Sequence, residues 1–305
     1  MKKVILILSA ALLLCSAPSF GWGGQVHAAI GRVADNHLTP KTRAALNKYI
    51  GTLSLADIAS DADRCRGIWT RDFGKEIVNK EDFRLGHAFL NDSIPSNIEP
   101  WTHSFVVDEN FECYHYDLME IDGKTYGLNN CVFYIEKFAK ELRENADKMD
   151  RETVYREIAL MTHWLGDMHC PMHIQYFNRD MYKGHMKFKM EIGGEPISLH
   201  GWWDGGIMRL LASSAGFEDV ARYADKNYAE DYAEVTKGDI YDWGSADAKD
   251  AWEAHVWEGK PIIDYEAEGL KVNFTYAEKM RPLCYRQIRN GGWRLAALLN
   301  SIFDN

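Results

Sequence analysis

Apolar and polar positions alternate along this chain mainly at helical spacing. Between residues 132 and 146 the apolar side chains fall three or four positions apart, at Val132, Ile135, Phe138, Ala139 and Leu142. Such spacing places them along one face of an α-helix, where they can pack against a core. The pattern therefore predicts an amphipathic helix here, and it predicts further helices over 199–213 and 286–303.

Capping residues and prolines indicate where other helices begin and end. Thr39 followed by Pro40 is typical of a helix N-terminus and predicts a helix over 41–50. Asp150 can cap a long helix that Pro171 would stop, because proline has no amide hydrogen to donate.

One short stretch favours strands. Residues 186–197 carry mixed apolar residues on both sides of Gly193-Gly194, which is typical of a hairpin. The sequence contains no internal repeat and no low-complexity linker that would divide it. The pattern as a whole predicts a mainly α, single-domain fold with a small β-hairpin.

The N-terminus has the pattern of a secretory signal. Lysines precede an apolar run over residues 4–15, which is too short to span a bilayer. Small residues stand at the positions that signal peptidase reads, so we expect cleavage before Trp22. This predicts a signal over residues 1–21 and one mature domain over 22–305, secreted or periplasmic. We expect no membrane contact after cleavage, and we expect a monomer.

The charge balance restricts the kind of substrate site. The chain carries 35 basic and 45 acidic residues, a formal charge of −10 that becomes −12 when the two lysines of the signal are removed. This argues against a basic groove that grips many phosphates. An enzyme of nucleic acid with this balance needs another electrophile for phosphate, which bound metal can supply.

Cysteine usage is compatible with an oxidising compartment. The mature chain would keep five cysteines: Cys65, Cys113, Cys131, Cys170 and Cys284. Disulfide bonds are permitted there, but the number is odd and the sequence does not fix the pairing.

Two histidine–aspartate pairs carry the strongest chemical signal. His163 and Asp167, like His200 and Asp204, stand four positions apart, so on a helix both side chains of a pair project from one face. A histidine and a carboxylate so placed can bind one zinc ion together. A buried ion pair explains the first pair equally well. Two such pairs favour metal, because ordinary salt bridges seldom use histidine twice.

The segment after Asp167 offers another candidate. Pro171 breaks the helix, which allows His173 to turn back toward a metal. His169 falls roughly 120° from the stripe of Asp167 on the same helix and is a weaker candidate.

A mature N-terminus at Trp22 would add a third group. His27 follows five residues later. A free α-amine has a pKa of about 7.7–8.0, low enough to deprotonate when zinc binds. On composition alone, a fraying terminus with a surface histidine explains this segment better.

Two further segments offer contacts to metal and substrate. Asp63 and Arg66 lie three positions apart, so a carboxylate can hold metal while the guanidinium grips a phosphate oxygen. A solvated helix end is the commoner outcome for such a run. In the aromatic segment around His115, Tyr116 can stack a nucleobase. His103 is the competing histidine, and packed strand aromatics explain either segment as well.

Taken in order, these residues resemble the trinuclear-zinc single-strand-specific nucleases. That family comprises fungal secreted and plant bifunctional nucleases, within the zinc phospholipase C/nuclease superfamily. The matching positions are Trp22, His27, Asp63, Arg66, His115, Tyr116, His163, Asp167, Pro171, His173, Leu199, His200 and Asp204. The resemblance implies a mainly α-helical fold, in agreement with the hydrophobic pattern.

The resemblance also implies three zinc ions per chain. The implied ligand groups are Asp63, His115, His163 and Asp167 for the first zinc, Trp22, His27 and Asp167 for the second, and His173, His200 and Asp204 for the third. Asp167 would bridge two ions and act in catalysis together with Arg66, and Tyr116 would bind a substrate base.

The implied reaction is hydrolysis of phosphodiester bonds in single-stranded DNA and RNA, with 5′-phosphorylated products and a companion 3′-nucleotidase activity. Zinc would activate the attacking water. Two alternatives stay open. A zinc phospholipase C has a similar metal architecture, although its last pair is His-x-x-x-Glu, and a zinc-binding relative would have lost catalysis.

Three positions depart from the family pattern. Asp61 stands where the family usually has tryptophan, and residues 183–185 replace its Gly-Gly-Asn, which leaves the role of His185 open. The excursion before His115 is longer than usual. We prefer His115 to His103 as the ligand because an aromatic residue follows it.

Overall fold

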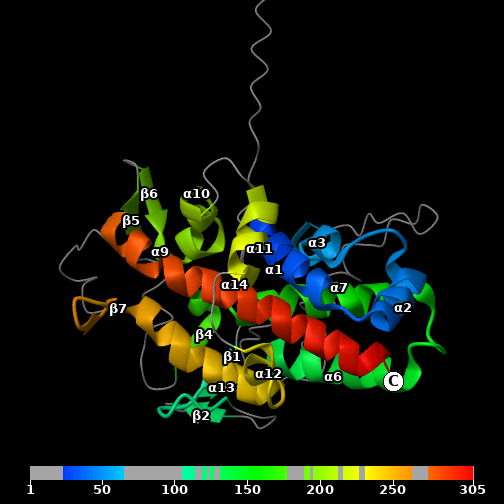
Figure 1. The fold of residues 1–305 in the computed structure, drawn as a ribbon. Coiled ribbons are helices and arrows are strands. Elements are labelled where there is room, and N and C mark those ends of the chain that lie inside the picture. Colours follow the sequence, from blue (N-terminus) through cyan, green and yellow to red (C-terminus); the bar gives the residue numbers. More distant parts are fainter. Residues whose placement is uncertain are drawn as a thin grey trace, which may run out of the picture.

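Helices dominate the molecule, and the longest, α14 (Phe274–Phe303), crosses its middle (Figure 1). The structure is a computed structural model that describes residues 23–64, 105–113, 119–121, 124–126, 131–176, 189–192, 195–211, 216–226, 231–262 and 274–304. The other main helices are α1 (Gly24–His37), α2 (Pro40–Ile50), α6 (Cys131–Asn145), α7 (Arg151–Met168), α11 (Gly216–Lys226) and α13 (Ile240–Ala251). This architecture confirms the mainly α prediction.

Shorter helical segments connect these helices. They are α3 (Leu55–Ile58), α4 (Asp61–Arg64), η1 (Pro171–His173), α9 (Leu199–Gly201), η2 (Trp202–Gly206), α10 (Ile207–Leu211), α12 (Tyr232–Val235) and η3 (Trp252–His255).

Strands occur only as short pairs within the described residues. They are β1 (Phe105–Val107) with β4 (Ile174–Tyr176), β2 (Met119–Ile121) with β3 (Lys124–Tyr126), β5 (Lys189–Ile192) with β6 (Glu195–Ser198), and β7 (Val256–Trp257) with β8 (Lys260–Pro261). The antiparallel β5–β6 pair places Lys189 opposite Ser198 and confirms the expected hairpin. The β1–β4 pair is parallel, which joins a segment near residue 105 to the end of η1.

Local sequence signals account for most helix starts. The Thr39 hydroxyl accepts a hydrogen bond from the Thr42 amide, and Pro40 occupies the first helical position, so α2 begins as predicted. The Asp150 carboxylate accepts from the Thr153 amide and caps α7. The predicted amphipathic helix is α6, whose buried face is apolar.

Two boundaries differ from the prediction. α14 begins at Phe274 rather than at residue 286 and contains Pro282 in its interior. Its amphipathic face is buried along the whole length, and this packing outweighs the lost hydrogen bond. The predicted helix over 199–213 is interrupted by the π-helical turn η2, and its described part ends at Leu211.

The first helix packs directly on the last. A Cβ added at Gly292 of α14 would lie 2.4 Å from Cβ of Val33 and 2.9 Å from the carbonyl oxygen of Ile30 on α1. Only glycine permits this approach of the two backbones. Figure 1 shows α1 and α11 above α14, with α13 below it.

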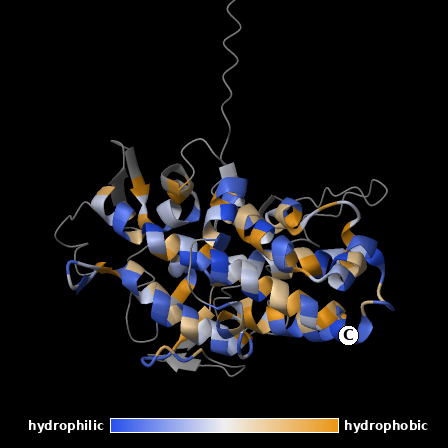
Figure 2. Cartoon of the chain, in the orientation of Figure 1, coloured by the Kyte–Doolittle hydropathy of each residue, from blue (hydrophilic) through white to orange (hydrophobic). Residues whose placement is uncertain are grey.

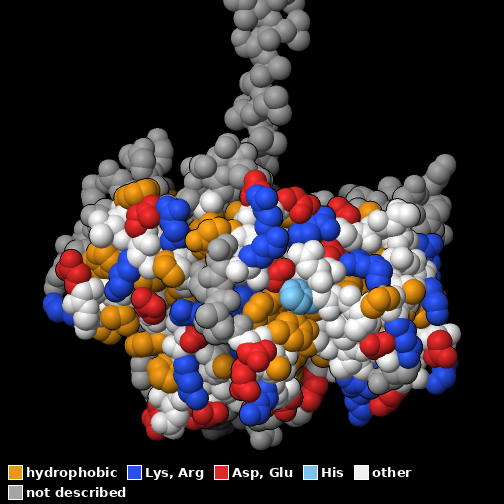
Figure 3. All heavy atoms as spheres, in the orientation of Figure 1, with side chains coloured by type: hydrophobic (Ala, Val, Ile, Leu, Met, Phe, Trp, Pro, Cys, Tyr) orange, Lys and Arg blue, Asp and Glu red, His pale blue; other side chains and the backbone are white. Residues whose placement is uncertain are grey.

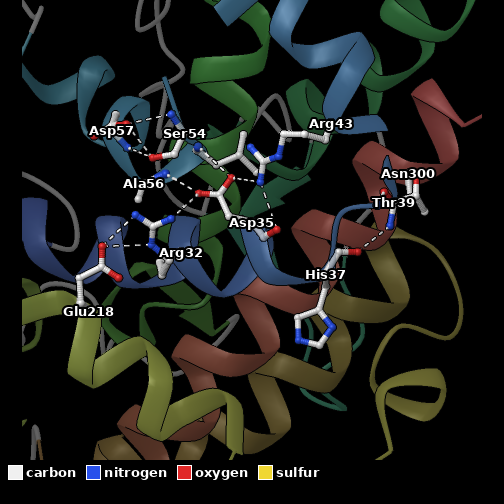
Figure 4. Close-up of polar contacts among 11 residues, drawn as sticks. Arg32, Asp35, His37, Thr39, Arg43, Ser54, Ala56, Asp57, Glu218 and Asn300 are labelled. Carbon is white, nitrogen blue, oxygen red and sulfur yellow. Dashed lines mark hydrogen bonds and ion pairs between the residues drawn. The ribbon is translucent and has the colours of Figure 1, made fainter. Parts of the chain in front are cut away.

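A polar network fixes α1 to its neighbours (Figure 4). The Asp35 carboxylate accepts hydrogen bonds from Arg43 on α2 at 2.6 Å and from the amide of Leu55 at the start of α3 at 3.2 Å. Arg32 pairs with Glu218 of α11 at 2.8 Å. The network therefore orients three elements around the helix that carries His27.

The surface matches the acidic, mixed composition. Figure 2 shows apolar and polar positions alternating along the helices, and Figure 3 shows acidic and basic side chains interspersed over one face, with no basic stripe on it. None of the described helices is long and apolar enough to cross a membrane.

Candidate metal centre

His163 and Asp167 lie one turn apart on the buried face of α7. The Nε2 atom of His163 is 3.2 Å from Oδ2 of Asp167. The Nδ1 atom of His163 lies 3.0 Å from the carbonyl oxygen of Ala59, to which it must donate because a carbonyl only accepts. This second contact leaves Nε2 without a proton in the neutral ring and directs it at the carboxylate.

His27 approaches the same carboxylate from α1. Its Nε2 atom is 3.4 Å from Oδ1 of Asp167, and its ring stacks on that of His163 at 4.1 Å. A Cβ at Gly166 would lie only 2.5 Å from Nδ1 of His27. The glycine between the ligand candidates of α7 is therefore what makes room for the His27 ring.

A second group surrounds Asp204. His200 and Asp204 lie four positions apart, with Nδ1 to Oδ2 at 3.2 Å. His173, turned inward by η1 after Pro171, places Nε2 at 3.2 Å from Nε2 of His200 and at 3.8 Å from Oδ1 of Asp204. The predicted turn of His173 toward a common site is thus observed.

His173 also connects the two groups. Its Nδ1 atom lies 3.4 Å from Oδ1 of Asp167. Asp167 is completely buried, and neither of its carboxylate oxygens accepts a hydrogen bond from the described residues. Burial raises the pKa of Asp167, but the positive charge that His163 and His173 carry when protonated outweighs it and holds that pKa well below its usual range. The centre is built around an ionised carboxylate.

These residues fit bound metal. An unprotonated imidazole nitrogen and a carboxylate oxygen facing each other at 3.2 Å repel unless a cation lies between them. A buried carboxylate surrounded by three imidazoles is expensive without such a cation, and nitrogen and oxygen donors of this kind are those that zinc prefers. The described residues contain two groups able to hold an ion: His27 with His163 and Asp167, and Cys170 with His173 and Asp204.

His169 points elsewhere, as its helical position predicted. Its Nδ1 atom donates to the carbonyl of Leu165 at 2.7 Å, and its Nε2 atom accepts from Arg294 of α14 at 2.9 Å. Burial and the Arg294 charge lower the pKa of His169 well below its usual value. This neutral histidine anchors the end of α7 rather than joining the metal groups.

Part of the predicted site lies outside the described residues. This applies to Trp22, Arg66, His115 and Tyr116, to the alternative His103, and to the side chain of Asp63, whose backbone belongs to α4. The assignments of these residues stay predictions.

The chain next to Trp22 is described and lies at the centre. The amide of Gly23 donates a hydrogen bond to the carbonyl oxygen of Asp204. The first described residue is therefore held against a candidate ligand of the second group.

Sequence reasoning missed two features. Cys170 belongs to the second group, whereas the sequence identified it only as a possible disulfide partner. Asp61 occupies the position where tryptophan was expected, and the hydroxyl of buried Tyr155 on α7 donates a hydrogen bond to its carboxylate. The thiols of Cys131, Cys170 and Cys284 are free and buried, so none of these three forms a disulfide.

The fold and the site define the class of protein: a mainly helical protein with a buried histidine–aspartate centre able to hold metal. The chain belongs to the S1/P1 nuclease family, which matches residues 22–304. This membership confirms the expected family and identifies the protein as a hydrolase of ester bonds, a nuclease. It favours a nuclease over the phospholipase C alternative.

Relatives of known activity cover almost the whole chain at low identity. Endonuclease 2 of Arabidopsis thaliana is 22% identical, over 98% of this chain and 97% of that protein. Nuclease S1 of Aspergillus oryzae is 23% identical over 98% of this chain and 97% of its own length. Nuclease P1 of Penicillium citrinum is 21% identical over 92% of this chain and 97% of its own length.

Proposed function

We propose that the protein is a zinc-dependent endonuclease of single-stranded DNA and RNA that releases 5′-phosphorylated products and also acts as a 3′-nucleotidase. The observation that carries the proposal is Asp167, a buried carboxylate facing His27, His163 and His173 within 3.4 Å. The names of the relatives, which include endonucleases, support nucleic acid as the substrate.

Three zinc ions per chain account for all of the candidate ligands. We assign Asp63, His115, His163 and Asp167 to the first ion, Trp22, His27 and Asp167 to the second, and His173, His200 and Asp204 to the third. The described donors support only part of this assignment: His27 and His163 lie together at Asp167, and His173 lies with Asp204.

Each side chain then has a defined task. Zinc held by these histidines and carboxylates would act as a Lewis acid and would lower the pKa of a bound water toward neutrality. Asp167 stays ionised in its buried position, with Oδ1 facing His27 and His173 and Oδ2 facing His163. Arg66 neutralises charge that develops on the phosphoryl oxygens, and Tyr116 stacks an unpaired base, which gives the preference for single strands.

We propose that the protein is exported. Removal of residues 1–21 as a signal would leave a mature domain over 22–305 with its α-amine at Trp22. Cleavage would create the α-amine that the proposed site uses as a ligand. This is compatible with a secreted or periplasmic enzyme that acts as a monomer.

Zinc content and nuclease activity, measured on the same preparation, test the proposal. We expect about three zinc ions per chain, because tetrahedral and bridged sites divide the nine ligands into three groups. We also expect release of acid-soluble nucleotides from heat-denatured DNA faster than from duplex DNA, and no hydrolysis of a chromogenic phosphocholine ester. Active protein that holds one zinc or none would refute the trinuclear centre, and bound zinc without hydrolysis would indicate a catalytically impaired relative.

The choice between His115 and His103 needs its own variants. His115→Ala should lose a zinc ion and nearly all activity, whereas His103→Ala should keep its zinc. The reverse result would assign the ligand to His103.

A further inference from the structure

Cys170 lies inside the second metal group, where the proposed assignment gives it no task. Its side chain is completely buried, and its Sγ atom is 3.9 Å from Oδ1 of Asp204. The sulfur, a ring nitrogen of His173 and a carboxylate oxygen of Asp204 all lie within 4.8 Å of one another. The thiol is free, so its sulfur is available as a donor.

The backbone fixes Cys170 between two proposed ligands. Its amide donates to the carbonyl of Asp167 at 2.9 Å, and its own carbonyl accepts from the amide of His173 at 2.9 Å. Pro171 follows and restricts the turn. Cys170 therefore cannot leave the group without displacing Asp167 or His173.

We propose that Cys170 is a fourth protein ligand of the ion held by His173, His200 and Asp204. The S–H bond breaks as the sulfur–metal bond forms, and the proton leaves to solvent. This inference rests on the proposed metal centre and adds a thiolate to it.

The spacing of the donors around His173 and Asp204 suits a tetrahedral ion. With metal bonds of about 2.0–2.1 Å to nitrogen or oxygen and about 2.3 Å to sulfur, tetrahedral angles place neighbouring donors roughly 3.3–3.6 Å apart. With one donor atom per residue, the observed separations are 3.2 Å between Nε2 of His173 and Nε2 of His200, 3.8 Å between Nε2 of His173 and Oδ1 of Asp204, and 3.9 Å between Sγ of Cys170 and Oδ1 of Asp204. Each differs from the expected spacing by about half an ångström or less.

A thiolate would change the character of this site. Four protein ligands complete a tetrahedron, which is the arrangement of structural zinc sites, whereas catalytic sites keep an open position. Thiolate is also a soft donor that selects zinc over manganese or magnesium. The ion at His173 would therefore be held more tightly and more selectively than a group of histidine and carboxylate alone allows.

The test is the absorption spectrum of the cobalt-loaded full-length mature protein. Cobalt(II) bound by thiolate shows a sulfur-to-metal charge-transfer band in the near ultraviolet, which nitrogen and oxygen ligands do not produce. We expect this band in the wild type, and we expect Cys170→Ala and Cys170→Ser to lose it while keeping the visible cobalt bands. Cys284→Ala is the matched control, because Cys284 is an equally buried free thiol in the same apolar cluster, and it should keep the band.

Chelator competition gives a second readout that does not depend on activity. In the Cys170 variants one metal ion per chain should be removed at a chelator concentration at least tenfold lower than in the wild type, and the Cys284 control should match the wild type.

Several results would overturn the proposal. A wild type that binds cobalt without the charge-transfer band shows that the thiol is not a ligand, while the metal centre itself stands. If Cys284→Ala loses the band and Cys170→Ala keeps it, the thiolate ligand is Cys284 and the proposal is wrong. Failure of the wild type to bind cobalt or zinc at all refutes this ligand and the proposed function together. A wild type that lacks the band overturns the proposal even if the Cys170 variants do not fold.

Discussion

At the scale of single residues, the centre depends on small side chains as much as on its ligands. Gly166 lies between His163 and Asp167 on α7, and the ring of His27 fills the space that a Cβ would occupy. A methyl group there would push His27 away from the carboxylate that it faces. The ligand geometry is therefore sensitive to a residue that offers no donor atom.

We expect Gly166→Ala to lose metal at the His27 group and most of its activity. Overpacking of this kind costs roughly 1–3 kcal/mol of stability, so the variant should still fold. Zinc content by elemental analysis and circular dichroism on one preparation provide the measurement. Gly205→Ala is the control, because its added Cβ would meet no atom within 4 Å. Full zinc content in Gly166→Ala would contradict the packing argument.

Glu157 on α7 gives a pH prediction that is independent of the metal. Its burial, with the charge of Glu141 adding to it, raises the pKa of Glu157 from 4.5 to about 8. The folded protein therefore holds a proton that the unfolded chain releases. The free energy of unfolding should fall as the pH rises from about 4.5 to about 8, and then level off.

Glu157→Gln removes this group and should be more stable than the wild type above a pH of about 8. The gain should be on the order of 1–3 kcal/mol, and it should disappear in acid, where both side chains are neutral. Urea denaturation at a series of pH values measures it. Glu144→Gln, an exposed change of the same charge on α6, should show no such gain. Equal curves for Glu157→Gln and the wild type would contradict the prediction.

At the scale of elements, helices that are joined by polar networks hold the candidate ligands in position. Asp35 lies on α1 two turns beyond His27 and accepts hydrogen bonds from α2 and from the start of α3. Its side chain is only 3% exposed. Since α3 leads into α4, which contains Asp63, this network orients two elements that carry proposed ligands.

Asp35→Ala should lower the free energy of unfolding by roughly 2–4 kcal/mol, because it leaves two backbone amides without their acceptor and removes the carboxylate that pairs with Arg43. Asp35→Asn keeps an acceptor oxygen and should cost less. Urea denaturation of the zinc-loaded proteins separates the two variants. If Asp35→Ala were as stable as the wild type, the network would have no role in joining these helices.

Sequence patterns predicted those features of the site that lie within one element. His163 with Asp167, and His200 with Asp204, were expected to share a helix face because four positions are only slightly more than one turn, and the two side chains of each pair do face each other. The hairpin and the caps of α2 and α7 were predictable for the same reason, since each depends on neighbouring residues.

Features that depend on contacts between elements were not predictable. The hydrogen bond from His163 to the carbonyl of Ala59 could not be predicted from the sequence, because every residue has a backbone carbonyl. Asp61 departs from the family pattern, and only the structure shows that Tyr155 donates a hydrogen bond to its carboxylate. The early start of α14 at Phe274 likewise reflects burial against other helices, which overrides the local signal of Pro282.

At the scale of the whole molecule, the start of α1 lies against the centre, next to the proposed mature N-terminus. The Gly23 amide is held by the carbonyl of Asp204, and His27 lies on the first turn of α1. Chain added before Trp22 would convert the α-amine into an amide, which is a poor donor to zinc at neutral pH, and would crowd the groups nearby.

Protein that keeps residues before Trp22 should therefore fold but hydrolyse denatured DNA at least tenfold more slowly than protein beginning at Trp22, at matched zinc. The helices do not depend on one terminal residue, so the circular dichroism spectra should coincide. Equal specific activity with an intact extension would refute the amine ligand and leave the other groups to be tested separately.

The packing of α1 on α14 has a consequence for the timing of folding. These helices come from opposite ends of the sequence, and Val33 meets Gly292 only when both are present. Contacts between such distant segments close slowly and late. A nascent chain still on the ribosome lacks the surface that supports His27 beside Asp167. We therefore expect the enzyme to be unable to cut the messenger RNA from which it is being translated.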